Sequence, residues 1–336
     1  QKLSLSGIFM AVTIVEIAKE LNLSHTTVSR VLNGKAGGFV SEKTQEMVFQ
    51  KAKEMGYTPN YNARALVTGK TNTIAFIGGF DLPDAIYGWL VREARQTTSN
   101  HGYEIITGDL NAFLKIKIDG LIGLGIDNFE AIDKLNIPIV NIDIKSNPNA
   151  ENLKYDTVCI DSGIGYRNIL THIYNQGCRN ISFVHTNPLD VWETDPRVVI
   201  YKEIINEKGL SEHYIDVKYQ TRDMASGEFY NYLQNHNLSD AYICSNDNNA
   251  LAVISALYQS GYNVPSDTLV TGFDGMQETK CSIPPLTTLD IDYKLAIEKG
   301  ISILIQRLSG DDKEIKHFEI ITANAHIRES AIKQKS

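Results

Sequence analysis

Apolar residues near the start of the chain recur at helical spacing. One face of a short first helix would carry Ile14, Ile17, Ala18 and Leu21. Asn22 tolerates the left-handed backbone that ends such a helix. Leu23 can then fill the gap before a second helix. The pattern predicts two short helices joined by a tight turn.

The second helix is expected to begin after Ser24, whose hydroxyl can accept a backbone N–H of the first turn. Its apolar positions, which would face the first helix, are Val28, Val31 and Leu32. The opposite face would carry His25, Thr26, Thr27, Ser29 and Arg30. Short polar side chains with one arginine suit base edges and phosphates in a major groove. Two amphipathic helices in an ordinary core would show the same pattern.

The next segments extend this pattern into a small all-α unit. A third helix is predicted from Ser41 to Met55, with Ser41 as N-cap and Gly56 beyond its end. Pro59 and Asn60 can start a further short helix that ends before Gly69. That helix would carry Ala63, Arg64, Ala65 and Leu66. An exposed leucine beside a basic residue is unusual in a plain linker.

From Thr73 onward, short apolar runs alternate with amphipathic stretches. The predicted order is TIAFIGGF, a helix at 87–100, YEIITGD, GLIGLG, a helix at 129–135 and PIVNIDI. A second series has helices at 165–176, 198–208, 226–235 and 250–260 among ISFVHT, YIDVKYQ, AYICSND and TLVTGFD. The tail adds LTTLDID, a helix at 293–308 and HFEIITANAHI. Alternating strands and helices predict two α/β subdomains with doubly wound parallel sheets.

Two ordered stretches carry a family resemblance. VEIAKELNLSHTTVSRVLNG and VSEKTQEMVFQKAKEMGYTPNYNARALVTGKTNTIAFI are similar to the lactose-repressor (LacI/GalR) family of bacterial transcription regulators. The resemblance continues to IPPLTTL and HIRES. It implies a DNA-binding domain at 11–57, a hinge at 58–70 and an effector-binding core at 71–336. The core would be bilobed and periplasmic-binding-protein-like, with an N-subdomain near 71–160 and 291–320 and a C-subdomain near 161–290 and 321–336.

One segment departs from the family pattern. Between the strand ending near Asp109 and the strand starting near Gly120, only LNAFLKIKID is present, where relatives have a full helix. We expect these residues to be too few for a helix that crosses a sheet and returns. Either the segment is truncated, or residues are missing from the sequence.

The charge is distributed unevenly. The chain has 32 Lys and Arg against 40 Asp and Glu, a formal net charge of −8. Residues 10–70 carry eight basic and five acidic residues, whereas residues 71–336 carry 23 and 35. A locally basic head on an acidic body is typical of a protein that binds phosphates through the head alone. Chance fluctuation can also give such a small excess.

Other sequence features narrow the class of protein. The cysteines at 159, 178, 244 and 281 have no CxxC spacing and are interpreted as reduced core residues. The histidines lack metal-site spacing, and no nucleotide loop, nucleophile elbow or membrane-length apolar run is present. We therefore expect no enzyme activity, metal or cofactor. Residues 1–9 lack the features of a signal peptide and precede a Met10 interpreted as the natural start, so we expect a cytoplasmic protein.

Ligands of parallel α/β sheets bind beyond the carboxyl ends of the strands. Polar residues at these ends are Asp81, Asp143, Asn246, Asp247 and Asp274. The resemblance aligns Arg197 and the stretches 142–144, 245–247 and 272–274 with effector contacts. Candidates for an apolar wall are Ile86, Tyr87, Trp89 and Trp192, two of which are expected to be plain core. An Asp after a strand is also a common N-cap, and Trp192 could be a surface aromatic.

The combined hypothesis is a homodimeric DNA-binding repressor with a small sugar as effector. The residues expected to contact operator DNA are Ser24, His25, Thr26, Thr27, Ser29, Arg30, Asn33, Lys35, Asn60, Ala63, Arg64 and Leu66. Leu66 would insert into the minor groove, and ligand-driven lobe movement would alter the hinge. A family member that senses a purine or another metabolite, and a sugar-binding protein serving transport, are the alternatives. The short AIKQKS tail favours a dimer over a coiled-coil tetramer.

Overall fold

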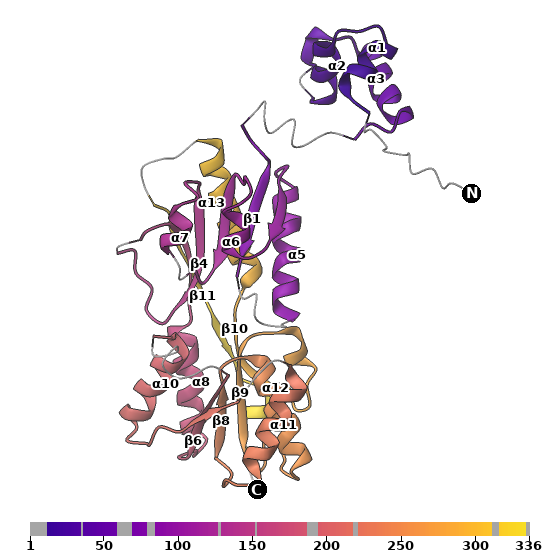
Figure 1. Cartoon of the computed structure of the whole chain (residues 1–336). Helices are drawn as coiled ribbons and strands as arrows, with labels where there is room; N and C mark the ends of the chain where they lie inside the picture. The colour runs from indigo at the N-terminus through magenta and orange to yellow at the C-terminus, as the bar shows by residue number, and fades with distance from the viewer. Residues whose placement is uncertain are drawn as a thin grey trace, which may run out of the picture. The chain divides into compact units, whose positions relative to one another are not determined.

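The chain divides into two compact units, Gln1–Thr71 and Asn72–Ser336 (Figure 1). The structure is a computed structural model that describes residues 12–34, 36–58, 69–78, 85–126, 129–151, 153–186, 194–217, 221–310 and 316–333. Each unit has its own hydrophobic core.

The first unit is a small helical domain. Its elements are α1 (Ile14–Glu20), α2 (His25–Leu32), the 3-10 turn η1 (Gly37–Phe39) and α3 (Glu42–Glu54). The fully buried Ile17, Val28 and Val48 bring one apolar residue from each helix into a common core. Leu23 packs against that core between α1 and α2, as its position predicts.

Local signals at the helix ends explain these boundaries. The Ser24 hydroxyl accepts a hydrogen bond from the Thr27 N–H at 3.0 Å, so the predicted N-cap of α2 is confirmed. Ser41 caps α3 in the same way at 3.3 Å. Asn22 and Gly56 have φ values of 51° and 68°, which end α1 and α3 with left-handed residues.

The second unit contains two six-stranded sheets. The first has the order β11-β5-β4-β3-β1-β2, and all its neighbouring pairs are parallel. Its strands are β1 (Thr73–Ile77), β2 (Glu104–Thr107), β3 (Gly120–Leu124), β4 (Ile139–Lys145), β5 (Asp156–Asp161) and β11 (Phe318–Thr322). We call this sheet with its helices the N-lobe.

The second sheet has the order β12-β10-β9-β8-β6-β7. Its strands are β6 (Ile181–His185), β7 (Tyr214–Asp216), β8 (Ala241–Cys244), β9 (Leu269–Asp274), β10 (Thr287–Asp290) and β12 (Asn324–His326). All pairs are parallel except the edge pair β10–β12, which is antiparallel. Among the described strands, this short edge strand departs from the predicted parallel sheets. We call this half the C-lobe.

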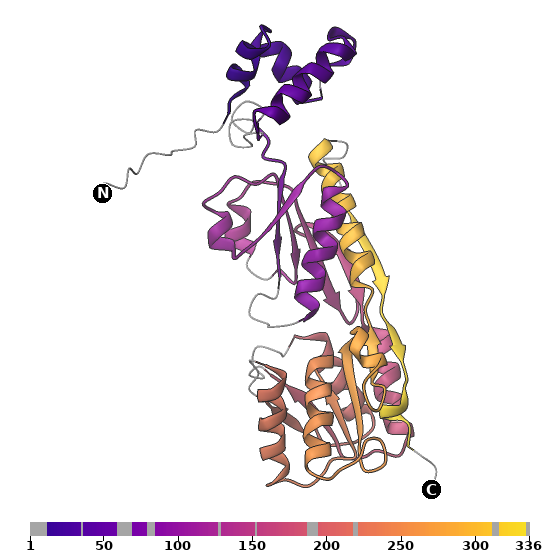
Figure 2. The ribbon, with the colours of Figure 1, turned by 90° about the vertical axis from the view of Figure 1, so that its right-hand side faces the viewer.

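Helices cover both faces of each sheet (Figures 1 and 2). In the N-lobe they are α5 (Ala85–Ser99), α6 (Leu110–Phe113), α7 (Phe129–Asp133) and α13 (Tyr293–Ser309). In the C-lobe they are α8 (Gly163–Asn175), α10 (Pro196–Glu207), α11 (Arg222–Leu233) and α12 (Asp247–Gln259), with the turns η2 (Gln277–Lys280) and η3 (Glu329–Ala331). Figure 2 shows α5 and α13 side by side on one face of the first sheet.

Alternation along the strands explains why both faces are covered. In β1, Ile74 and Phe76 belong to the core beneath α5 and α13, whereas Ala75 between them belongs to the core with Phe113 of α6. All of these side chains are almost completely buried. Strands that are apolar on both faces require a helix layer on each side.

The chain passes between the lobes three times. It leaves the N-lobe after β5, returns between β10 and α13, and leaves again between β11 and β12. Because the passages lie next to one another, the loops at the facing strand ends of both lobes converge. The fold-class prediction of an all-α head followed by a bilobed α/β core is confirmed.

The short segment between β2 and β3 differs from what its length predicts. These strands are parallel and lie on opposite sides of β1, so residues 108–119 do make the crossover that the sequence was expected to be too short for. They do so with the single helical turn α6, whose Phe113 is 1% exposed and anchors the segment to the sheet. One turn suffices because only one strand has to be crossed.

A buried ion pair fastens α13 to the N-lobe sheet. The Arg307 Nε atom donates to Oδ2 of Asp156 and Nη2 donates to Oδ1, both at 2.8 Å. The His317 N–H donates to the same carboxylate at 2.8 Å. Burial tends to raise the pKa of Asp156, but Arg307 and the His317 amide lower it below its usual value.

The cysteines differ in exposure. Cys159, Cys178 and Cys244 are buried as expected, but Cys281 is exposed and therefore is not a core residue. It follows η2, in a loop at the surface of the C-lobe, rather than a strand. Among the helices in the described ranges, none has both the length and the apolar character needed to cross a membrane.

Candidate DNA-binding face and ligand pockets

The exposed face of α2 presents three side chains to solvent. His25, Thr26 and Arg30 are exposed, while Val28 and Val31 behind them are buried. Thr26 and Arg30 are four residues apart and therefore share one face of the helix. The face presents hydroxyl, imidazole and guanidinium groups, and the opposite side of α2 is packed into the core of the first unit.

The other polar residues predicted for DNA contact also hold α2 together. The Ser24 and Thr27 hydroxyls lie 2.8 Å apart at its N-terminus. At its C-terminus the Asn33 amide donates to the Ser29 carbonyl at 2.7 Å and to the Ser29 hydroxyl at 3.2 Å. These four side chains bond within the ends of the helix; Ser24 is exposed, whereas Thr27, Ser29 and Asn33 are half-buried. Lys35, Asn60, Ala63, Arg64 and Leu66 lie outside the described residues.

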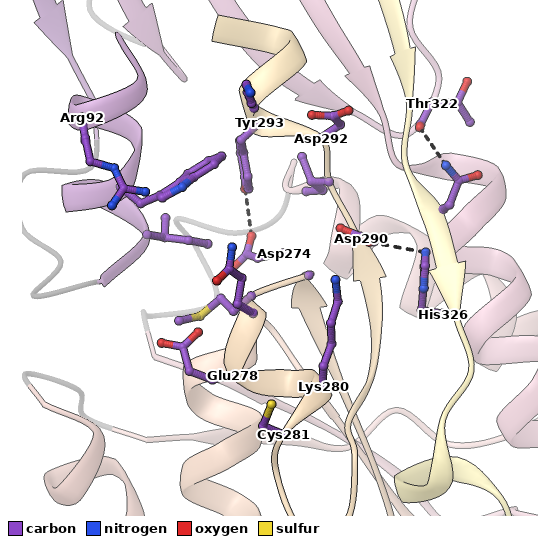
Figure 3. A pocket seen from close by; sticks show the side chains of 18 residues that line it. Arg92, Asp274, Glu278, Lys280, Cys281, Asp290, Asp292, Tyr293, Thr322 and His326 are labelled. Atoms are coloured by element: carbon purple, nitrogen blue, oxygen red, sulfur yellow. Dashed lines mark hydrogen bonds and ion pairs between the residues drawn. The ribbon is translucent and has the colours of Figure 1, made fainter. Parts of the chain in front are cut away.

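A cavity of about 790 Å³ opens where the two lobes meet (Figure 3). Ile86, Trp89 and Arg92 of α5 line it from the N-lobe, and the loop from Asp274 to Cys281 lines it from the C-lobe. Asp290 to Lys294, Thr322, Asn324 and His326 complete the lining, so the segments that connect the lobes form part of the wall. We call it the large cavity.

Asp274 lies at the centre of this arrangement. Its carboxylate accepts a hydrogen bond from the Tyr293 hydroxyl at 2.8 Å, which joins the end of β9 in the C-lobe to the start of α13 in the N-lobe (Figure 3). Its φ of 117° is unusual for a residue other than glycine and marks local strain. Burial and the nearby Asp274 charge raise the pKa of Tyr293, so the tyrosine stays a neutral donor.

A second cavity of about 410 Å³ contains Asp143, Arg197 and Phe273 in its lining. The Arg197 Nε and Nη2 atoms donate to the Asp195 carboxylate at 2.8 and 2.7 Å, and Nη1 donates to the Ser245 carbonyl at 2.7 Å. The guanidinium carbon lies 5.1 Å from the centre of the Phe273 ring. Asp143 is paired with Lys145 at 2.7 Å. We call it the small cavity.

Electrostatics connect the two cavities. Burial alone would lower the pKa of Arg197, but the Asp195 carboxylate and then Asp274 raise it, so the guanidinium stays charged. Asp274 lines the large cavity and Phe273, its neighbour in β9, lines the small one. The structure thus brings Asp143, Arg197 and Asp274 to one region, around the end of β9.

Asn246 and Asp247 have internal roles in the C-lobe. Asn246 is the N-cap of α12, because its side-chain oxygen accepts the Asn249 N–H at 2.8 Å. Asp247 is fully buried and accepts hydrogen bonds from the Thr288 hydroxyl at 2.6 Å and the Met276 N–H at 2.7 Å. Burial raises the pKa of Asp247 to about 7. Its carboxylate shapes the loop after Asp274 and has no surface exposed to a ligand.

The candidates for an apolar wall are divided in the same way. Ile86 and Trp89 line the large cavity, whereas Tyr87 packs toward the core, with its ring 6.0 Å from that of Phe76. Burial raises the pKa of Tyr87 to about 12. Asp81 and Trp192 lie outside the described residues.

Sequence reasoning missed two residues of this site. Tyr293 supplies the bond to Asp274, and Asp195 holds Arg197 in place. Asp195 had a sequence signal, because Asp-Pro at a helix start marks an N-cap followed by proline at the first helical position. Tyr293 had no local signal, since its partner lies 19 positions away. Within the described ranges, no group of three or more His, Cys, Asp or Glu side chains could hold a metal.

A helix-turn-helix unit followed by two α/β lobes with polar cavities between them defines a ligand-responsive DNA-binding regulator. Comparisons agree with this class. Residues 13–60 match the family model described as bacterial regulatory proteins, lacI family, and residues 170–331 match the periplasmic binding protein-like domain. The HTH-type transcriptional regulator DegA of Bacillus subtilis is 30% identical over 83% of this chain and 86% of its own length. The chain belongs to the lacI family of bacterial regulatory proteins.

Other relatives cover nearly the whole chain. The ribose operon repressor of Halalkalibacterium halodurans is 28% identical over 92% of this chain and 94% of its own length. Among solved structures, a lac repressor dimer bound to operator and the anti-inducer ONPF matches with a TM-score of 0.78. The two are 22% identical, and the match covers 96% of this chain and 100% of that one. This second likeness supports the fold.

Proposed function

We propose that this regulator represses a carbohydrate-utilisation operon by binding a pseudo-palindromic operator as a homodimer in the cytoplasm, with a small sugar as effector. A similar protein is named a ribose operon repressor, and a structural neighbour is a dimer bound to operator DNA. A short recognition helix reads few base pairs, so two copies on adjacent major grooves give the needed specificity. Residues 58–70 would form the hinge between the DNA-binding domain and the core.

The observation that supports DNA reading is the exposed face of α2. Thr26, His25 and Arg30 would contact base edges, with Arg30 suited to guanine or phosphate. In residues 60–67, outside the described structure, Leu66 would act as a wedge in the minor groove. Leu66→Ala should weaken operator binding and leave effector affinity unchanged.

The chemistry of the small cavity favours a neutral polyol as effector. In the small cavity, Arg197 is paired with Asp195, and Lys145 with Asp143, so each cation among its described lining residues has its own carboxylate. Carboxylate and guanidinium groups fixed in this way can accept from and donate to hydroxyl groups. Structural neighbours include complexes with cellobiose, lactose and ribose. These cavities would sense a ligand and carry out no catalytic step.

Movement of the lobes would transmit ligand occupancy to DNA. A sugar in the small cavity that contacts Arg197 from the C-lobe and Asp143 from the N-lobe would have different affinities for open and closed arrangements of the lobes. It therefore shifts the population of the core conformations and, through the hinge, the spacing of two DNA-binding domains. The Tyr293–Asp274 hydrogen bond joins the two lobes, so it would have to adjust when they move.

The test has two parts. The first selects duplexes from a random-sequence pool with the full-length protein and measures binding at moderate salt; we expect an inverted repeat with half-sites about one helical turn apart. The second screens sugars, nucleobases and sugar phosphates by thermal shift. Stabilisation by a nucleobase alone would replace the sugar assignment with the purine alternative. Failure to select any sequence would refute the operator function.

A further inference from the structure

A large apolar side chain is exposed on the DNA-binding unit, beside α2. Phe39 ends the turn η1 and is 86% exposed. A phenyl ring exposed to water contributes little to the stability of the fold, whereas burying it in a complex is favourable. Its exposure indicates a contact that the isolated chain does not make.

The ring lies against the cation of the recognition helix. The Arg30 guanidinium carbon is 5.9 Å from the centre of the Phe39 ring, within the range of a cation–π contact. Arg30 shares its helix face with Thr26, and both side chains are exposed. Phe39 therefore adds an apolar surface to the edge of the polar face that we assign to DNA.

We propose that Phe39 is a DNA-contact residue whose ring packs on an apolar part of the duplex, a thymine methyl or a deoxyribose, next to the group bound by Arg30. This inference rests on the proposed role of α2 in operator recognition. Duplex DNA is the expected occupant because an arginine stands beside the ring and the surface continues the face of α2. A binding partner for an isolated apolar ring would not need the adjacent cation.

The ring would act in two ways. It would remove water from one side of the Arg30 guanidinium, which strengthens the hydrogen bonds and ion pairs made on the other side. It would also contribute apolar contact that carries no charge. Binding through charge releases counterions and depends steeply on salt, whereas apolar contact does not. The salt dependence of binding therefore separates the contribution of Phe39 from that of Arg30.

The experiment uses the full-length protein and the duplex that the wild type selects from a random pool. Affinity is measured for wild type, Phe39→Ala, Phe39→Leu and Arg30→Gln between 50 and 200 mM salt, a range of about fourfold in ion concentration. Phe39→Ala should weaken binding about tenfold with the salt slope unchanged. Arg30→Gln should reduce the slope by about one. Phe39→Leu should lie between wild type and Phe39→Ala, because it keeps apolar surface and loses the ring.

The control is Phe49→Ala, which removes another ring from the same unit. Phe49 is 52% exposed and lies on α3. Its removal should change operator affinity by less than about twofold. Circular dichroism melts should show all variants folded, since both rings are at the surface.

The outcomes distinguish this inference from the proposed function. If no duplex is selected, operator recognition itself fails. If a duplex is selected but Phe39→Ala binds it within twofold of wild type, or Phe49→Ala loses as much, Phe39 is no DNA contact. A reduced salt slope in Phe39→Ala would show that the ring only positions Arg30, and would overturn the direct contact.

Discussion

Arg197 joins Asp195 to Ser245 beside the small cavity, and the stability lost when this clamp is broken can be worked out from its hydrogen bonds. Arg197→Lys keeps the positive charge but replaces a planar fork by a single nitrogen. The guanidinium reaches the Asp195 carboxylate through two atoms and the Ser245 carbonyl through a third, at 2.7–2.8 Å. One ammonium cannot occupy both positions, so the variant loses at least one side of the clamp.

The structure sets the size of the effect. Hydrogen bonds to charged groups contribute about 1.5–3 kcal/mol each. Asp195 is 20% exposed and can regain water, whereas Ser245 is fully buried and its carbonyl would lose a donor. We therefore expect Arg197→Lys to lower the free energy of unfolding by about 2–4 kcal/mol. Sugar affinity should fall as well, because the small cavity loses the guanidinium and its fixed set of donors.

Urea unfolding followed by tryptophan fluorescence is the assay. Both tryptophans of the chain, Trp89 and Trp192, belong to the second unit, so the signal reports that unit alone. The matched control is Arg167→Lys, because Arg167 pairs with Glu203 at the surface. Such exposed pairs contribute about 0–1 kcal/mol. If the two variants lose the same stability, within about 0.5 kcal/mol, the clamp does not stabilise the C-lobe and the reasoning is refuted.

Three further changes test other parts of the structure. Ser24→Ala removes the N-cap of α2 and should cost about 1 kcal/mol in the thermal transition of the DNA-binding unit; no change would show that the Thr27 amide finds water instead. Asp156→Asn leaves the Arg307 charge buried and should cost about 3 kcal/mol near pH 7. Because the folded-state pKa of Asp156 is lowered, the wild type should be more stable than Asp156→Asn above about pH 4, and this difference in free energy of unfolding should disappear as the pH falls further. Urea unfolding that gives the same difference at every pH would contradict the ion pair. Gly227 lies inside α11 with open space around it, so Gly227→Ala should stabilise the protein by about 0.5–1 kcal/mol. Gly163→Ala would push a methyl group into a backbone carbonyl and should destabilise the protein. Equal melting temperatures for the two variants would contradict both expectations.

Local signals made the DNA-binding unit predictable. The spacing of Ile17 and Ala18, the left-handed Asn22 and the caps Ser24 and Ser41 all act over a few residues, and the structure confirms each. The alternation of strands and helices likewise predicted the fold class. Family resemblance supplied the three passages between lobes, which no local pattern encodes.

The site was only partly predictable, because strand ends supply more polar residues than a ligand can contact. Asp143, Arg197 and Asp274 line cavities, so their predicted contact with an effector stays a prediction. Asn246 and Asp247 follow a strand in the same way but serve as helix cap and buried loop anchor. Which carboxylate faces a cavity depends on loop geometry. The length rule for crossovers failed for a related reason, since it could not anticipate that Phe113 would let one turn span a single strand.

By itself the sequence determined which segments are helices and strands, where the capped helices of the DNA-binding unit begin, and that a basic head precedes an acidic α/β body, because these depend on neighbours a few residues away. The helices of the core begin two to four residues earlier than predicted in several cases, as with α11, predicted from 226 and observed from Arg222. Only the tertiary structure decided that Tyr293 binds Asp274 across the lobes, that Asp195 clamps Arg197, and that Phe39 stands exposed beside Arg30. Such pairs join residues that no sequence period relates. They form because chain packing brings donors, acceptors and rings within contact distance.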